Sequence, residues 1–261
     1  MKAARVGDDD ATTGGTVRGP RPRGGRWWRR LGVGVLLLLA LFAGGLCAGW
    51  ALTPSVAGAP GRVASRLAAH QAMPMTSLPH PDKTGQALVA TEDSRFYLDP
   101  GVDPLGMVRG VLGLIDGHDT GGAGLDQQLA KMLYTPGDDA PGAQAEQVML
   151  ALKIDAHYGK PAQLRMYENT AYFGHGLYGL PAAARGYFHR TPARLSWAQA
   201  SMLAGVVQAP SAYDPLNHLA LARARQHHVL DRLVATGTLT PAQARSAAHR
   251  RLHLTGDAAS G

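Results

Sequence analysis

Residues 196–207 read Ser-Trp-Ala-Gln-Ala-Ser-Met-Leu-Ala-Gly-Val-Val, and this stretch indicates the fold class. Ser196 is a residue type that caps helix starts, and apolar side chains follow it at the spacing of a helix. Thr240-Pro241 has the same character, an N-cap residue followed by proline at the first helical position. Further helices are expected at 63–70, 105–115, 125–133, 147–156, 162–172, 182–188 and 219–235. Alternating strand patterns are nearly absent, so the soluble part is predicted to be mainly α.

A long apolar stretch precedes that region. From Leu31 to Thr53 there are 23 residues without a charge, directly after Arg29 and Arg30. About 20 apolar residues suffice for a helix to cross a bilayer. The positive-inside rule then places residues 1–30 in the cytoplasm and the rest outside. A cleaved signal peptide is the alternative, because Ala57-Gly58-Ala59 resembles a cleavage site. Against it, the stretch exceeds the usual signal core of about 7–15 residues. We therefore expect a single-pass anchor in the cytoplasmic (inner) membrane.

Charge and cysteine content exclude several classes of protein. The net charge of +7 is concentrated in residues 1–30, which hold eight Lys or Arg and three Asp. The remaining 231 residues carry 18 basic and 16 acidic side chains, so nucleic acid is not a predicted partner. The single cysteine excludes an internal disulfide framework. No H-E-x-x-H or paired C-x-x-C spacing occurs, so no structural metal site is predicted.

Composition shifts divide the chain into five segments. A disordered basic tail (1–30) precedes the transmembrane helix (31–53) and a stalk (54–85). The main domain covers 86–237, and a C-terminal helix and tail cover 238–261, with the end expected to be loose. Within the main domain, 174–179 fits G-x-G-x-x-G. A dinucleotide site is not expected there, because no buried strand precedes the glycines and no acid follows at the required distance.

The stretch from Ala87 to about Gly237 contains a series of short polar and glycine-rich blocks. In order, they are Glu92-Asp93-Ser94-Arg95-Phe96, Gly121-Gly122, Gln127-Gln128-Leu129-Ala130-Lys131, Lys160, Tyr167-Glu168-Asn169, Tyr172-Phe173-Gly174, Leu203-Ala204-Gly205 and Pro210-Ser211-Ala212-Tyr213. Any one block is a weak signal, but the ordered series is specific. It resembles the peptidoglycan glycosyltransferase (transglycosylase) domain of penicillin-binding proteins, over about 150 of the 261 residues.

The resemblance implies a lysozyme-like, mainly α domain behind a single N-terminal transmembrane helix. It also implies a reaction, the polymerisation of lipid II into glycan strands with release of undecaprenyl pyrophosphate. No transpeptidase domain follows within this sequence, so the chain resembles the monofunctional type. Its implied partners are lipid II, the nascent glycan strand, the cytoplasmic membrane and other cell-wall synthases. Some family members respond to a divalent cation, so Mg²⁺ or Mn²⁺ is retained as a candidate cofactor, although no ligand set is legible.

The resemblance also assigns roles to individual residues. Glu92 matches the family's general base, which must lie beside the acceptor hydroxyl. Lys131 matches a residue that contacts the substrate phosphate, and Gln127 and Gln128 match a pair that shapes the donor site. The other predicted substrate-binding residues are Asp93, Phe96, Lys160, Tyr167 and Asn169. Purely structural roles remain alternatives: Glu92 and Asp93 as acids bound to helix-start N–H groups, and Lys131 as a solvated helix residue.

The sequence departs from the family pattern at a second glutamate. Counting back four residues from Ala151 gives Gln147, while Glu146 lies one residue early. One residue is about 100° of helix rotation, so Gln147, Ala151 and Asp155 share a face that Glu146 does not. The second carboxylate is therefore uncertain between 146 and 147, and Asp126 is a candidate to supply it. Further departures stand at Ala123, Gly124, Leu125, Ala143, Gln144, Arg165 and Gln199.

These departures leave three hypotheses. The first is a working glycan polymerase that retains Glu92 and Lys131. The second is a catalytically impaired relative that binds lipid II or glycan as a scaffold in cell-wall synthesis. The third is a hydrolase of glycan strands, which would need an acid and access for water rather than a phosphate-binding lysine.

Overall fold

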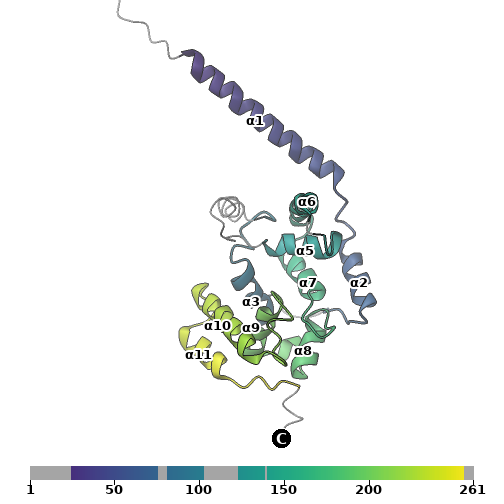
Figure 1. The fold of residues 1–261 in the computed structure, drawn as a ribbon, viewed down its shortest axis with the longest axis vertical. Coiled ribbons are helices and arrows are strands. Elements are labelled where there is room, and N and C mark those ends of the chain that lie inside the picture. Colours follow the sequence, from purple (N-terminus) through teal and green to yellow (C-terminus); the bar gives the residue numbers. More distant parts are fainter. Residues whose placement is uncertain (1–24, 76–80, 103–122, 139, 256–261) are drawn as a thin grey trace, which may run out of the picture. The chain divides into compact units, whose positions relative to one another are not determined.

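A computed structural model describes residues 25–75, 81–102, 123–138 and 140–255 (Figure 1). The chain divides into two units, residues 1–47 and 48–261. The first unit contains most of α1, which runs from Gly25 to Leu52. Among the described residues, only Trp27–Leu52 forms a helix long and apolar enough to cross a membrane. The helix begins six residues before the predicted Leu31, so 25–30 do not belong to a tail. Residues 1–24 and the predicted helix 105–115 lie outside the described residues.

The second unit is helical. Its elements are α2 (Ala59–Ala69), α3 (Lys83–Glu92), α5 (Leu125–Tyr134), α6 (Pro141–His157), α7 (Lys160–Thr170), α8 (Leu180–Phe188), a 3-10 turn (Pro192–Arg194), α9 (Trp197–Val206), α10 (Leu219–Ala235) and α11 (Pro241–His249). Among the described residues, the β pairing is limited to an isolated bridge between Tyr172 and Tyr178. The prediction of a mainly α domain is therefore confirmed.

The helix starts follow the predicted chemistry. The Ser196 side chain accepts a hydrogen bond from the Gln199 N–H, and the Gln199 side chain binds back to the Ser196 N–H. Thr240 and Gln243 form the same reciprocal box at the start of α11. Each box satisfies backbone N–H groups that have no partner within the helix.

The helices form two groups with α3 between them. In one group, α5 contacts α2, α6 and α7; in the other, α10 contacts α9 and α11. Helix α3 contacts α7 of the first group and both α9 and α10 of the second. Its Leu88 is fully buried, as are Leu164 of α7 and Leu203 of α9. The residues at the C-terminal end of α3 therefore lie where both groups can reach them.

The predicted stalk is wrong for the described part of 54–85, because that segment belongs to the domain. Val56, Val63 and Leu67 are buried in the same core as the later helices. The Met75 N–H also donates to the Asn169 Oδ1 of α7 at 2.7 Å. Buried apolar side chains four residues apart, Ala59, Val63 and Leu67, give α2 a buried stripe, which packs on α7.

The prediction of a loose C-terminal end is also wrong for the described residues up to 255. Leu252 and Leu254 are buried. The Leu252 carbonyl accepts a hydrogen bond from the Gln199 Nε2 at 2.9 Å, and the Thr255 N–H donates to the Tyr187 carbonyl. Two alternating leucines in a polar stretch thus fasten this segment to the domain.

The glycine pattern at 174–179 serves a tight turn. Gly174, Gly176 and Gly179 all have positive φ angles, which glycine adopts without steric cost. At Gly179 a Cβ would lie 3.0 Å from the Asn169 carbonyl oxygen. The glycines are therefore explained by backbone conformation and close approach.

Candidate functional site

Glu92 is the last residue of α3 and lies between α7 and α10. Its Oε1 accepts a hydrogen bond from Arg225 Nη2 of α10 at 2.9 Å. The two side chains are only 14% and 13% exposed, so this ion pair is shielded from water. Tyr167 of α7 is near enough to feel this carboxylate, because burial and then the negative charge of Glu92 raise the pKa of its hydroxyl group. The Glu92 carboxylate therefore has a neighbour from each helix group, Arg225 from α10 and Tyr167 from α7.

Asp93 follows immediately and binds the other helix group. Its Oδ2 accepts a hydrogen bond from the Leu125 N–H at the start of α5, at 3.1 Å. Gly124 is the N-cap of α5 and supplies no side chain, so Asp93 satisfies an N–H that would lack a partner. A Cβ at Gly124 would lie 2.7 Å from that Oδ2. The sequence change to glycine at 124 therefore allows this close approach.

Tyr167 also binds one of the two glutamines of α5. The Tyr167 hydroxyl donates to Gln128 Oε1 at 2.9 Å, and Gln128 Nε2 donates to the Ala123 carbonyl at 2.9 Å. Lys131 lies three residues after Gln128 and four after Gln127, on neighbouring positions of the same helix surface. Gln127, Gln128 and Lys131 are all half-buried. The structure therefore gathers Glu92, Tyr167 and Gln128, with Lys131 one turn further along α5.

Lys160 is bound by two carboxylates. Its Nζ lies 2.6 Å from Asp126 Oδ2 and 2.7 Å from Asp155 Oδ1. Burial raises the pKa of Asp126 to about 6, even though the ammonium group of Lys160 opposes this. For Lys160, burial would lower the pKa, but the hydrogen bonds to Asp126 and Asp155 raise it. Lys160 therefore stays charged, and burial makes Asp126 hold its proton to a higher pH than an exposed aspartate does.

Several predicted substrate-binding residues contact the protein itself. Phe96 is 1% exposed, and the Lys160 ammonium lies 4.6 Å from the centre of its ring. Asn169 is buried and accepts a hydrogen bond from the Met75 N–H. Phe96, Lys160 and Asn169 therefore have packing or hydrogen-bond partners within the protein.

The second carboxylate position is occupied by a buried amide. Gln147 is 4% exposed, and its Nε2 donates to Thr135 Oγ1 at 2.9 Å and to the Asp138 carbonyl at 3.2 Å. Ala151 is buried on the same face, whereas Glu146 is half-buried. Helix α6 begins regularly at Pro141, so no irregular start turns Glu146 inward.

One further departure, Gln199, has a structural explanation. Gln199 uses its Oε1 in the capping box of α9 and its Nε2 as a donor to Leu252, a bond that a glutamate could not make when ionised. Arg95, from the same sequence block as Glu92, binds Asp99 at 3.1 Å.

Sequence reasoning missed Arg225. Helix α10 contains several basic residues, and none of the recognised blocks includes this one. A signal was nevertheless present, because Ala222, Arg225, Val229 and Arg232 recur at intervals of three and four residues. A basic residue on the buried face of a helix indicates a hydrogen-bond acceptor on the neighbouring helix.

The candidate divalent cation has no ligand set in the part of the chain that the structure describes. Among the described residues, no group of three or more His, Cys, Asp or Glu side chains could hold a metal ion. Asp126 and Asp155 both bind the ammonium group of Lys160, so these two neighbouring carboxylates already share a cation of the protein.

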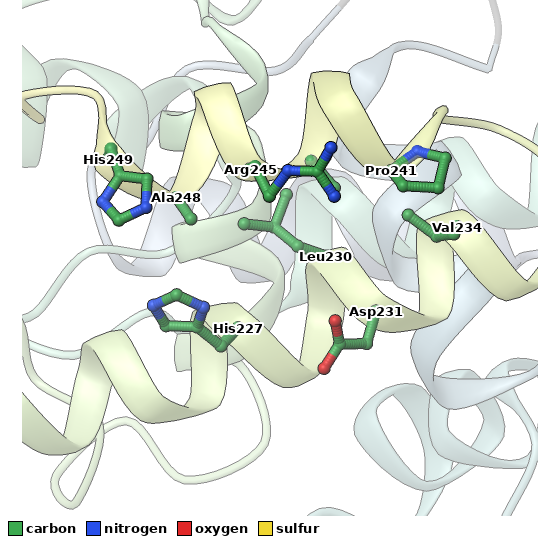
Figure 2. A pocket seen from close by; sticks show the side chains of 9 residues that line it. His227, Leu230, Asp231, Val234, Pro241, Arg245, Ala248 and His249 are labelled. Atoms are coloured by element: carbon green, nitrogen blue, oxygen red, sulfur yellow. The ribbon is translucent and has the colours of Figure 1, made fainter.

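A separate pocket of about 240 Å³ lies between α10 and α11 (Figure 2). His227 and Asp231 of α10 face Arg245 and His249 of α11 around an apolar floor that includes Leu230. This pocket is on the α11 side of α10, whereas Arg225 binds α3.

Comparison with known proteins identifies the family. A family model described as Transglycosylase matches residues 61–234. The chain therefore belongs to the transglycosylase family and has its mainly α, lysozyme-like fold.

The relatives differ greatly in length. A Cupriavidus necator protein that carries a transglycosylase name is 35% identical over 208 residues, which are 78% of this chain and 89% of that protein. Penicillin-binding protein 1A of Escherichia coli is 34% identical over 187 residues, 71% of this chain but 22% of that protein. Penicillin-binding protein 1A of Neisseria flavescens is 36% identical over 169 residues, 64% of this chain and 21% of that protein. The chain thus spans about a fifth of the length of the penicillin-binding proteins that it matches. A crystal structure of penicillin-binding protein 1A from Haemophilus influenzae is 24% identical, with a TM-score of 0.33 over 50% of this chain and 16% of that one.

Proposed function

We propose that this chain is a peptidoglycan glycosyltransferase that polymerises lipid II, with Glu92 as the general base. The observation that carries the proposal is the setting of Glu92. It ends the helix that contacts both helix groups, with Arg225 of α10 bound to it and Tyr167 of α7 near enough to feel its charge. Membership of the transglycosylase family and the position of Glu92 in its Glu-Asp block support the same role.

The proposed chemistry is a displacement at a sugar carbon. Glu92 accepts the proton of the acceptor 4-hydroxyl while that oxygen attacks the anomeric carbon of the donor. The bond between the anomeric carbon and the pyrophosphate oxygen breaks, and undecaprenyl pyrophosphate leaves with inversion. Negative charge grows on the leaving phosphate, and the ammonium group of Lys131 is the proposed group that stabilises it.

The apolar helix α1 fits this substrate. Lipid II is anchored in a membrane by its polyprenyl chain, and a membrane-spanning α1 would hold the domain beside it. Arg29 and Arg30 precede the apolar run, so we propose that the N-terminus is cytoplasmic and the domain lies outside. Other cell-wall synthases are proposed as partners for the same reason, because they use the same membrane surface.

The test is polymerisation of fluorescent lipid II by the full-length chain in detergent, read on a gel. We expect glycan ladders from the wild type and a loss of about 10²–10⁴-fold in rate for Glu92→Gln, which keeps the shape but removes the base. Asp231→Asn, an exposed position on the α11 side of α10, is the matched control and should keep the wild-type rate. Equal rates for the wild type and Glu92→Gln would refute the role of Glu92.

A second candidate function is a scaffold that binds lipid II or glycan without polymerising it. Gln147 favours it, because an amide bonded to Thr135 and Asp138 occupies the position where the family pattern has a carboxylate. Binding of fluorescent lipid II with no ladder would support this function. Shortening of preformed glycan in the same assay would instead support a hydrolase.

A further inference from the structure

The side chain of Arg225 passes Gly205 of α9 on its way to Glu92. At Gly205 of α9, an added Cβ would lie 3.0 Å from Arg225 Cγ, tighter than ordinary contact between such atoms. The stem of Arg225 therefore lies against the backbone of Gly205. The guanidinium carbon also stands 6.0 Å from the centre of the Tyr213 ring. Gly205 and Tyr213 belong to two of the sequence blocks that carry the family resemblance, and here both contact the same arginine.

The contact leaves one oxygen of Glu92 open. Arg225 binds Oε1, and in the described part of the chain Oε2 accepts no hydrogen bond from the protein. A planar guanidinium is always charged and directional, so it fixes the plane of the carboxylate that it binds. An oxygen presented in a fixed direction suits the abstraction of a proton from a hydroxyl at one place.

We propose that Arg225 is a positioning residue for Glu92, and that Gly205 provides the space that this role requires. The proposal rests on the proposed function and adds to it a residue that does not touch the substrate. Arg225 orients the Glu92 carboxylate by binding its Oε1. Its loss should therefore lower kcat while the KM for lipid II changes little.

The matched control is Arg232, two turns along the same helix. Arg232 Nε also binds α3, donating to the Ala90 carbonyl at 3.1 Å, but it does not touch Glu92. Arg225→Met and Arg232→Met each remove one arginine between α10 and α3. Only Arg225→Met removes a hydrogen bond to the proposed base, Glu92.

The experiment measures polymerisation of fluorescent lipid II by the full-length chain and these variants. We expect Arg225→Met to lower kcat about 10–100-fold with KM changed less than about threefold, and Arg225→Lys to recover part of the loss. Gly205→Ala should lower kcat in the same direction, because its methyl group displaces the Arg225 stem. Arg232→Met should keep kcat within about threefold of the wild type.

Two double-mutant cycles test the coupling directly. In the Glu92→Gln background, Arg225→Met should cause no further loss of kcat, because there is no base left to position. The effects of Glu92→Gln and Arg225→Met on urea unfolding should likewise be non-additive, whether or not the chain is active. Additive effects in either cycle, or an equal loss of kcat in Arg232→Met, would overturn the proposal. If wild-type chain forms no polymer, the proposed function fails and the positioning role falls with it. If polymer forms but the cycles are additive, only the positioning role fails.

Discussion

At the scale of single residues, Glu168 is the most unusual group in the domain. Its side chain is 0% exposed within α7. A Cβ at Gly85 would lie 2.9 Å from its Oε1, so α3 approaches it with only a glycine between. Burial, and then the neighbouring Asp82 with which it shares a hydrogen bond, raise the pKa of Glu168 well above its usual value. This carboxyl group is therefore protonated in the folded domain over a wider pH range than in the unfolded chain.

That difference predicts a pH dependence of stability. Because the folded-state pKa is raised, the stabilisation is present at acidic pH and is lost as the pH rises above the usual value of 4.5. We expect the free energy of unfolding to fall from pH 5 to pH 7, with a slope of at most about 1.4 kcal/mol per pH unit from this one group. Glu168→Gln, which cannot ionise, should flatten this dependence. Urea denaturation at several pH values is the measurement.

Asp126 supplies the control for that series. Its pKa of about 6 gives a dependence of the same sign, confined to the range between its usual value of 3.8 and 6. Asp126→Asn should remove only that portion, so the two variants together separate the groups. Identical pH dependence in wild type and Glu168→Gln would show that Glu168 does not carry the effect.

A second prediction at this scale concerns Gln147. Glu at this position would place a carboxylate oxygen against the Asp138 carbonyl, which can only accept, while the Thr135 hydroxyl would turn to donate to the carboxylate. We expect Gln147→Glu to lower the free energy of unfolding by about 1–3 kcal/mol at pH 7. Glu146→Gln, at the half-buried neighbouring position, should change it by less than about 0.5 kcal/mol. A Gln147→Glu variant of full stability and higher polymerisation rate would show that the position still acts as a carboxylate site.

At the scale of elements, α6 fastens the segment that follows the apolar helix. Within the second unit, Lys153 Nζ donates to the carbonyls of Thr53 at 2.7 Å and Pro54 at 3.2 Å. The Tyr158 hydroxyl lies 2.9 Å from the Val56 carbonyl. Lys153 is 7% exposed and also lies 5.5 Å from the centre of the Trp50 ring. A cation near the last carbonyls of a helix is favourable for its dipole.

The hydrogen bonds of Lys153 should protect residues 53–57 from amide hydrogen exchange and from proteolysis. Lys153→Met keeps the apolar stem but removes both hydrogen bonds, so residues 53–57 should exchange amide hydrogens faster and be cleaved sooner by protease. We expect an increase of about tenfold in exchange, equivalent to about 1.4 kcal/mol. Asp231→Asn, an exposed change on α10, is the comparison variant and should leave the exchange unaltered. Unchanged exchange in Lys153→Met would mean that the contact contributes nothing to the stability of this segment.

The elements also show what the sequence could predict. The bounds of α10 follow from apolar spacing, and the starts of α9 and α11 from their N-cap residues, because these signals are local. The attachment of α2 and of Leu252 depends on partners far along the chain, such as Asn169 and Gln199. The pairing of Arg225 with Glu92 joins residues 133 positions apart, so no local pattern contains it.

At the scale of the whole molecule, the packed core belongs to the second unit. Every residue of the buried apolar cluster lies at Val56 or later. We therefore expect a chain of residues 48–261 to unfold in urea at the same midpoint as the full-length protein, within error. It should no longer sediment with lipid vesicles, and its polymerisation of lipid II in vesicles should fall more than in detergent. An unfolded fragment, or one that still sediments with vesicles, would contradict this division of roles.

The adjacent Glu92 and Asp93 bind opposite groups of helices, one through Arg225 and the other through the start of α5. An insertion or deletion at this dipeptide would turn both carboxylates toward the wrong neighbours, since a single residue changes direction by about 100° in helical backbone. Evolution can therefore vary the side chains around this point but not the chain length through it. Indels in related sequences should be sparse here and more frequent at exposed turns such as 136–138.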